Sequence, residues 1–259
     1  MRPGRDGRSR RTGTHGWRPA RTPRSGSSDP VVGPGSDRWP VVSPGVTPDA
    51  DASPSRIAAA ATLRRLGHAF VGHHVPDDVL DRLRVQVEEA LPEVEGGSVR
   101  RRPVADMKRR LYEAPPADGQ TMDHFPDCVV SGSANPMGIA IEVRREGEDA
   151  VARVALGAAF EGAPGRAHGG IVAAVFDDTM GFVLAMLGTP AFTGRLTVSY
   201  LAPTPVGEEL EFRARLRHRE GRKLWIDGEA WHGGERIASA EGLFIAIPAD
   251  RLAAAEAPG

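Results

Sequence analysis

Residues 165–187 read GRAHGGIVAAVFDDTMGFVLAML, a glycine-rich turn followed by a long apolar segment. We expect a helix that runs through this segment and ends before Gly188. A helix that is apolar nearly all round has to be buried, and an antiparallel sheet can cover it only by wrapping around it. Asp177 and Asp178 lie at its middle, and two adjacent carboxylates at bilayer depth would be very costly. We therefore do not expect this helix to span a membrane.

Short apolar runs bounded by turn residues predict β-strands on both sides of this helix. Two are expected before it and four after it, at 139–143, 150–156, 193–201, 208–219, 223–232 and 236–247. Arginines at every second position of 213–219 indicate a strand with one solvated face. A doubly wound sheet is the alternative, but it needs alternating helices, which this part of the sequence lacks. The order predicts an α+β fold with an antiparallel sheet wrapped around one long central helix.

The remaining chain divides by composition. Residues 1–55 contain nine prolines, eight glycines and eight serines, so they cannot bury enough surface to offset the entropy cost of ordering. We expect a disordered tail there, with a basic tethering tail as the alternative. Residues 56–119 are expected to form a helical extension, residues 120–250 the sheet and its helix, and residues 251–259 a C-terminal tail.

The extension shows helical periodicity in two places. Residues 56–69 and 77–91 carry apolar positions at helical spacing, with Ser55 as the expected N-cap of the first helix. The pattern also allows a short helix over 104–112. A metal site is the alternative use of three nearby histidines, but no acidic or cysteine partner completes it, so we expect no metal. These histidines are His68, His73 and His74.

The composition excludes several classes of protein. Lys+Arg 33 against Asp+Glu 34 gives a formal net charge of −1, which argues against nucleic-acid binding. The single cysteine, Cys128, excludes a disulfide within the chain and a Cys-rich zinc site. Residues 1–28 lack the apolar segment of a secretory signal. We therefore expect a cytoplasmic protein.

The turn before the central helix is a candidate site. Glycines let a ligand approach the backbone, and the first N–H groups of a helix are unpaired and lie at its positive end. Gly169 and Gly170 therefore suit an oxyanion that develops during a reaction. A phosphate-binding loop is the alternative, but neither the Walker pattern nor a preceding βαβ unit is present.

Asp177 and Asp178 interrupt the apolar helix, and a buried carboxylate is costly unless it is bonded or functional. One of the two is expected to bond to a neighbouring backbone or basic group. Gly170 and Asp177 share a face, because seven residues turn the helix by about 700°, and they lie about 10 Å apart along its axis. One carbonyl can hardly touch both within a single chain. Two such helices packed antiparallel would bring each Gly170 beside the partner's Asp177, so we expect a dimer with two shared active sites.

The ordered set of motifs identifies a family. His168-Gly-Gly with Asp177 nine residues after the histidine, and Leu196-Thr-Val-Ser-Tyr-Leu-Ala-Pro203, resemble the hotdog-fold acyl-CoA thioesterases of the PaaI type. Pro205-Val-Gly207 and Asn135-Pro-Met-Gly138 extend this resemblance to roughly residues 120–248. The leader Glu161-Gly-Ala-Pro-Gly165 and Thr193 look closest to the branch that includes the mammalian thioesterase-superfamily-member proteins.

The resemblance implies hydrolysis of an acyl-CoA thioester to a carboxylate and CoA, by a dimer or a dimer of dimers, without cofactor or metal. Asp177 matches the family's general base or nucleophile, and Gly170 matches the amide that polarises the thioester carbonyl. His168 helps to shape that loop, with a role as general base as the competing assignment. Thr193 stands where the family branch keeps a hydroxyl that positions the water.

The family resemblance also implies which residues contact the substrate. Arg222 and Lys223 match a basic position that would hold the CoA phosphates, although exposed turns are often basic in any protein. Gly169 and Asn135 are further candidates for substrate binding.

Two other functions stay open on the sequence. One is an acyl-CoA-binding protein that keeps the fold without catalysis, against which the retained Asp177 and Thr193 argue. The other is a hotdog hydratase acting on enoyl-CoA, which would pair its aspartate with a nearby histidine. No histidine follows Asp177 until His218, so this second function is the weaker.

Overall fold

The computed structural model describes residues 53–100, 115–122 and 125–248. The expected N-terminal tail, apart from its last three residues, lies outside this part of the chain. So do the short helix allowed at 104–112 and the C-terminal tail at 251–259.

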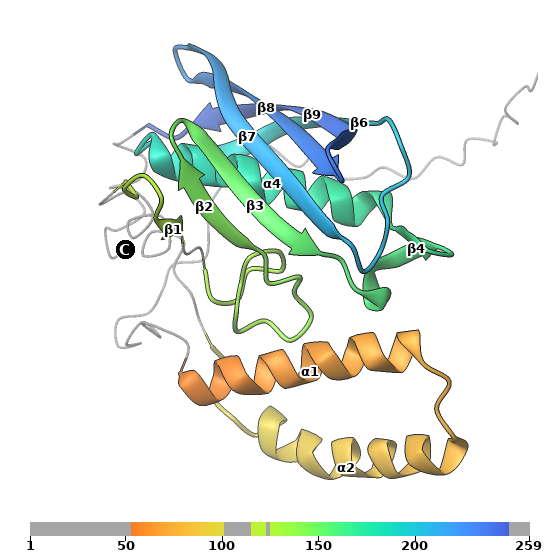
Figure 1. Ribbon diagram of the computed structural model, residues 1–259. Coiled ribbons are helices and arrows are strands. Elements are labelled where there is room, and N and C mark those ends of the chain that lie inside the picture. Colours follow the sequence, from red (N-terminus) through yellow and green to blue (C-terminus); the bar gives the residue numbers. More distant parts are fainter. Residues whose placement is uncertain (1–52, 101–114, 123–124, 249–259) are drawn as a thin grey trace, which may run out of the picture. The chain divides into compact units, whose positions relative to one another are not determined.

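The described residues form a seven-stranded antiparallel sheet in the order β1-β2-β3-β7-β8-β9-β6, curved around the helix α4 (Gly169–Met186). Figure 1 shows α4 running behind the strands, which cover it from one side. The strands are β1 (Thr121–Met122), β2 (Glu142–Glu146), β3 (Asp149–Ala155), β6 (Ala191–Tyr200), β7 (Glu209–Glu220), β8 (Lys223–His232) and β9 (Glu235–Ala246). A separate two-stranded hairpin, β4 (Glu161–Ala163) and β5 (Arg166–Ala167), precedes α4. The predicted α+β architecture with a central helix is confirmed.

The helix α4 packs its larger side chains into the concave face of the sheet. Phe176 is fully buried and meets Phe212 of β7 edge-on, with ring centroids 5.0 Å apart. A glycine makes room for it on β8, because a Cβ at Gly228 would lie 2.9 Å from both Phe176 and Met180. This contact explains why an apolar helix and a sheet can lie so close together.

The later strands match their predicted ranges to within two residues, and glycines account for the accuracy. Gly207 and Gly221 have φ values of 79° and 55°, a backbone conformation that glycine adopts without steric cost. Each of them marks the turn before a strand, as predicted.

The strand predicted at 139–143 is wrong at its start, because β2 begins only at Glu142. Ala140 has a φ of 59°, which breaks an extended strand. The amides of Ile139 and Ile141 donate instead to the carbonyls of Val129 and Val130 in the preceding loop.

The two helices of the extension are present, with shifted ends. The helix α1 (Pro54–Gly72) is capped by Ser53 rather than by Ser55, because Pro54 occupies the first turn, where a missing N–H costs nothing. The helix α2 (Asp77–Glu95) continues one turn beyond its predicted end, through Pro92. Neither helix is deeply buried, since Ala60 alone is buried in α1 and no residue is buried in α2.

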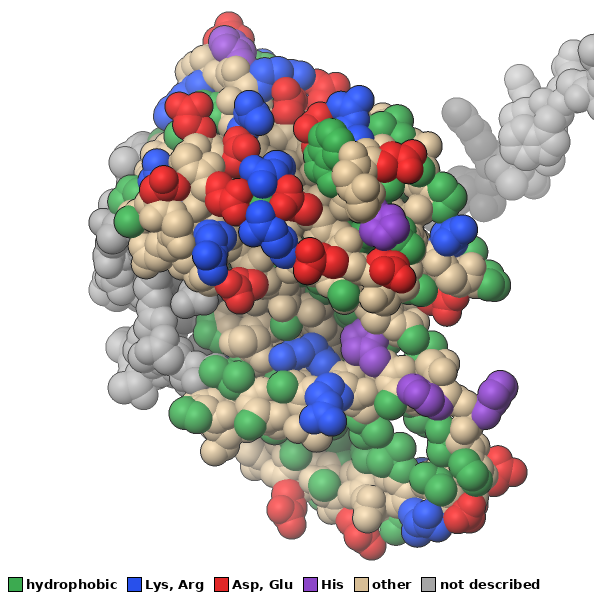
Figure 2. Space-filling model, in the orientation of Figure 1, with side chains coloured by type: hydrophobic (Ala, Val, Ile, Leu, Met, Phe, Trp, Pro, Cys, Tyr) green, Lys and Arg blue, Asp and Glu red, His purple; other side chains and the backbone are tan. Residues whose placement is uncertain are grey.

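The outer face of the sheet is exposed, as the alternating arginines predict, but it is not a basic surface. Figure 2 shows acidic and basic side chains interspersed over this face. Arg213 lies 2.6 Å from Glu211 and 3.0 Å from Glu146, and Arg217 lies 2.6 Å from Glu241. Carboxylates on β7 itself and on strands two positions away in the sheet thus balance the arginines of β7.

By length and composition, one helix in the described part of the chain, α4, could cross a membrane; half of it is buried inside the protein.

We expect Phe176→Ala to lower the free energy of unfolding by about 3–5 kcal/mol, because it removes a buried ring and leaves a cavity between α4 and β7. Denaturant unfolding with an unchanged slope measures this loss. The matched control is Phe70→Ala on α1, where the ring is 54% exposed and the expected change is within about 0.5 kcal/mol. Equal losses in the two variants would contradict the assignment of the core.

Candidate active site

The helix α4 begins with an unusual cap. His168 is its N-cap residue, and the His168 Nδ1 accepts a hydrogen bond from the Gly170 N–H over 2.9 Å. A neutral imidazole that accepts at Nδ1 carries its proton on Nε2. The predicted oxyanion donor, the amide of Gly170, is therefore bound to an exposed histidine ring in this structure.

Residues of the β4–β5 hairpin and of the segments beside it hold His168 in place. The backbone N–H of His168 donates to the carbonyl of Phe160 over 2.8 Å, and the preceding Ala167 donates to Thr204 over 2.9 Å. Gly162 lies against the histidine so closely that a Cβ there would be 2.8 Å from the His168 Cα. Gly162, in the segment that precedes His168, therefore has to be a glycine for this contact to form.

The carbonyl of Gly169 has a partner that the sequence does not predict. The hydroxyl of Tyr200, at the end of β6, donates to the Gly169 carbonyl over 2.6 Å. Strict alternation would place Tyr200 and Thr193 on opposite faces of β6, because they are seven residues apart. A bulge between Thr193 and Arg195 shifts the register, so both pair with β9 residues of the same face, Phe244 and Ala238.

Asp177 lies on the partly exposed side of α4 and is half-buried. The hydroxyl of Thr193 on β6 donates to the Asp177 Oδ1 over 2.8 Å, so the structure brings these two predicted site residues together. Burial raises the pKa of Asp177 above its ordinary value; the Thr193 hydrogen bond opposes this, and the negative charge of Asp178 adds to it. The carboxylate is thus held in one orientation and favours its protonated form more than a solvated aspartate does.

Asp178 faces another part of the molecule. The thiol of Cys128 donates to the Asp178 Oδ1 over 3.4 Å, which joins α4 to the loop that follows β1. One of the two aspartates was expected to bond to a neighbouring backbone or basic group. Asp178 makes such a structural bond, although this partner is a thiol.

The other predicted substrate contacts lie apart from Asp177. Asn135 uses both ends of its side chain within its own loop, where Nδ2 donates to Asp127 O over 3.0 Å and Oδ1 accepts from Met137 N over 2.8 Å. These bonds support the loop, and a role of Asn135 in substrate binding stays a prediction.

Arg222 and Lys223 lie at the turn between β7 and β8, and both are exposed. The Arg222 Nε donates to the Ala246 carbonyl over 2.9 Å. Lys223 pairs with Ile245 of β9, which in turn pairs with Phe192 of β6. The basic turn therefore lies two strand spacings, about 10 Å, from the strand segment that carries Thr193.

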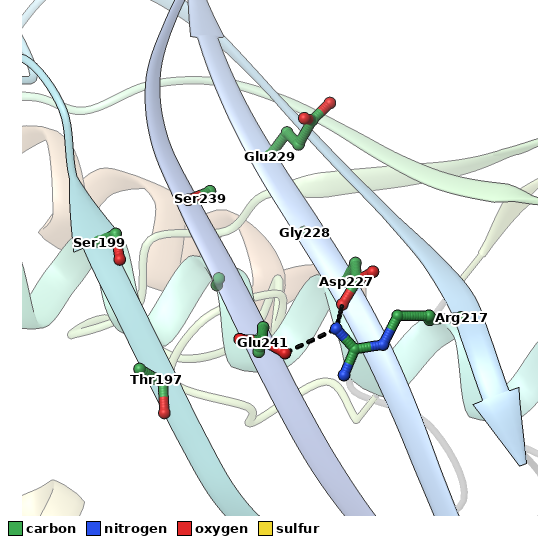
Figure 3. Close-up of a pocket in the computed structure, with 9 residues that line it drawn as sticks. Thr197, Ser199, Arg217, Asp227, Gly228, Glu229, Ser239 and Glu241 are labelled. Carbon is green, nitrogen blue, oxygen red and sulfur yellow. Dashed lines mark hydrogen bonds and ion pairs between the residues drawn. The ribbon is translucent and has the colours of Figure 1, made fainter.

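A hollow of about 240 Å³ lies on the outer face of the sheet, away from the helix. Figure 3 shows Arg217 between Asp227 and Glu241 at this hollow, with ion pairs of 3.2 and 2.6 Å. Pockets for small ligands are typically larger, about 300–1,000 Å³, and mostly apolar. This hollow is better explained as part of the charged outer surface than as a substrate site.

Within residues 53–100, 115–122 and 125–248, no group of three or more His, Cys, Asp or Glu side chains is arranged to hold a metal ion. His68 and His73 each bind a backbone group instead: His68 Nδ1 accepts from the Ala159 N–H, and His73 Nδ1 lies 3.0 Å from the Ala69 carbonyl.

Comparison with known proteins agrees with this architecture. Residues 164–239 match the family model of the thioesterase superfamily. The acyl-coenzyme A thioesterase THEM4 of Xenopus laevis is 36% identical over 66 residues, which cover 26% of this chain and 30% of that protein. THEM4 of Mus musculus is 34% identical over 91 residues, which cover 35% and 39%. The chain thus spans about a third of the length of these curated relatives.

A crystal structure of a thioesterase superfamily protein is similar over much of the chain. It superimposes with a TM-score of 0.63 at 25% identity and covers 79% of this chain and 94% of that one. The expected resemblance to hotdog-fold thioesterases is confirmed.

We expect Thr193→Val to raise the pKa of Asp177 further, because the variant removes the hydrogen bond that favours the ionised carboxylate. A carboxyl-carbon NMR titration of the side chain measures the change. Thr197→Val is the matched control, since Thr197 pairs with Glu241 on the outer face of the same strand. A pKa that is unchanged or lower in Thr193→Val would contradict this description of the site.

Proposed function

On its resemblance to hotdog-fold thioesterases, we propose that this chain hydrolyses an acyl-CoA thioester to a carboxylic acid and CoA. The observation that carries the proposal is Asp177, a half-buried carboxylate on the central helix, oriented by Thr193 and with a raised pKa. A carboxylate with a raised pKa is a stronger base than a solvated one and takes a proton from water more readily.

Asp177 acts as the base in the simpler of two routes. Its carboxylate takes a proton from a water molecule while the water oxygen bonds to the thioester carbon. The tetrahedral intermediate then collapses, the C–S bond breaks, and the leaving CoA thiolate takes up a proton. In the alternative route the carboxylate itself attacks, CoA thiolate leaves, and water hydrolyses the resulting anhydride.

Thr193 contributes by fixing one carboxylate oxygen. Its hydroxyl holds Oδ1 of Asp177, so that Oδ2 is the oxygen available to a water molecule. A fixed base loses less entropy on reaching the reactive geometry.

The amide of Gly170 is the proposed donor to the thioester carbonyl. It lies at the positive end of α4, where a donor stabilises the oxyanion of the intermediate. His168 Nδ1 occupies this N–H in the structure, so the carbonyl oxygen has to replace the imidazole there. The exposed position of the His168 ring leaves it room to turn away.

Two copies of the chain complete the site in this proposal. Gly170 and Asp177 lie about 10 Å apart along one helix, too far for a single carbonyl and its water. The edge strand β6 supports pairing, because Phe192 and Tyr200 near its ends and Leu201 just after it are 50%, 51% and 54% exposed. Exposed apolar side chains on a sheet edge are typical of a surface that another chain covers. Both a dimer and a dimer of dimers allow the antiparallel pairing of α4.

The basic turn is the proposed contact for the CoA phosphates. Arg222 and Lys223 are exposed cations about two strands from the segment of β6 that carries Thr193. Charge-assisted hydrogen bonds to phosphate need such groups.

We expect Asp177→Asn to lower kcat by about 10²–10⁴, the usual contribution of a positioned base, while the oligomer stays intact. The measurement is release of free thiol from a panel of short, medium, long and aromatic acyl-CoAs. The matched control is Asp227→Asn, the same change on the outer face of the sheet, which should keep its activity.

Unchanged turnover in Asp177→Asn would overturn the assignment of the base. Tight binding of acyl-CoA by the unaltered protein, with no thiol released from any member of the panel, would instead indicate a non-catalytic acyl-CoA-binding protein. Loss of enoyl absorbance from an enoyl-CoA without thiol release would indicate a hydratase.

A further inference from the structure

We propose that His68, in the N-terminal extension, is a positioning residue for the active site. Its imidazole holds the short helix whose Phe160 carbonyl binds the backbone N–H of His168, and the His168 carbonyl in turn binds the first turn of α4, which carries Gly170. The catalytic consequence rests on the proposed thioesterase function, whereas the structural consequence can be measured without it.

His68 caps a helix that has no cap of its own. The 3-10 helix η1 (Ala158–Phe160) starts after Gly157, which has no side chain to bind its free amides. The Nδ1 of His68 accepts from the Ala159 N–H over 3.1 Å. A side chain of α1 thus accepts the hydrogen bond that the side chain of an N-cap residue ordinarily accepts.

The fit between α1 and η1 is close and specific. The ring of His68 meets Phe160 edge-on, with centroids 5.0 Å apart. A Cβ at Gly157 would lie 2.5 Å from the His68 Nδ1, so only glycine allows this approach. One turn further along α1, Gly72 passes the side chain of Ala158, and a Cβ there would be 3.2 Å from its Cβ.

A short series of contacts joins this point to the reacting groups. The backbone N–H of His168 donates to the carbonyl of Phe160 over 2.8 Å. The carbonyl of His168 then accepts from the N–H groups of Ile171 and Val172 over 2.9 and 3.2 Å, so the backbone of His168 positions the first turn of α4 and with it the Gly170 amide. Gly162, two residues beyond η1, packs directly against His168, so the segment cannot move without the histidine.

Arg64 gives α1 a second fixed point one turn before His68. Its guanidinium donates to the carbonyls of Ser133 and Asn135 over 2.9 and 2.7 Å. These residues belong to the loop whose Cys128 contacts Asp178 in the middle of α4. Because α1 is anchored at two loops that both reach the central helix, His68 holds η1 from a fixed position.

The acceptor role requires a neutral imidazole. Burial lowers the pKa of His68, and the positive charge of Arg64 on the same helix lowers it further, so the neutral form is favoured. The facing residues of η1 are Ala158, Ala159 and Phe160, none of which titrates.

Two substitutions at His68 separate the acceptor from the ring. His68→Phe keeps a ring beside Phe160 but cannot accept from Ala159, and His68→Asn places its amide Oδ1 near the position of Nδ1. We expect His68→Phe to lower kcat about tenfold with little change in KM, since small displacements of a catalytic group have effects of this size. His68→Asn is expected to remain within about twofold of the unaltered protein. His73→Phe is the matched control, because His73 follows the last residue of α1 and its ring binds the Ala69 carbonyl of that helix.

Hydrogen–deuterium exchange of the full chain provides the readout that is independent of activity. His68→Phe should speed exchange in peptides covering residues 157–170, His68→Asn should not, and neither should change peptides of β7–β8. Equal exchange in His68→Phe and the unaltered protein would overturn the positioning role, and so would loss of activity in His68→Asn as large as in His68→Phe. If the unaltered protein hydrolyses no acyl-CoA, the proposed function fails, and the exchange experiment still decides the role of His68.

Discussion

Burial of α4 in the concave face of the sheet is the constraint on which the other features depend. Phe176 and Met180 come so close to β8 that Gly228 has no room for a side chain, and this contact sets the distance between helix and sheet. The same burial places Asp177 at the margin of the apolar core, where loss of solvation raises its pKa. The core therefore both stabilises the fold and makes the Asp177 carboxylate a stronger base than a solvated one.

The sequence allowed prediction of those elements whose signal is local. The helix α4 and the strands β7 to β9 were predictable to within two residues, because an unbroken apolar run and glycines with positive φ, such as Gly221, mark their ends. The start of β2 was not predictable, because the positive φ of Ala140 and the pairing of Ile139 with Val129 depend on a distant loop.

The candidate site likewise contains features that the sequence predicts and features that depend on the tertiary structure. Asp177 and Thr193 were each named as site residues from a family resemblance, and the structure adds the hydrogen bond that joins them. Tyr200 was missed because the bulge after Thr193 reverses the alternation of β6. The bond between His168 and the Gly170 amide was missed because the orientation of the imidazole depends on the backbone angles and packing around it. The ion pairs of Arg213 with Glu146 and of Arg217 with Glu241 were missed because these acidic partners lie two strands away in the sheet.

The central claim is that Gly170 of one copy and Asp177 of another form each active site, and hybrid dimers test it most directly. One chain carries Asp177→Asn and the other Gly170→Pro, which removes the amide in the first helical turn, where proline is tolerated. Each homodimer should be inactive, while the hybrid contains one site with both groups intact and should recover about half of the activity per dimer. A hybrid as inactive as both parents, with native dimer formation, would contradict the shared site.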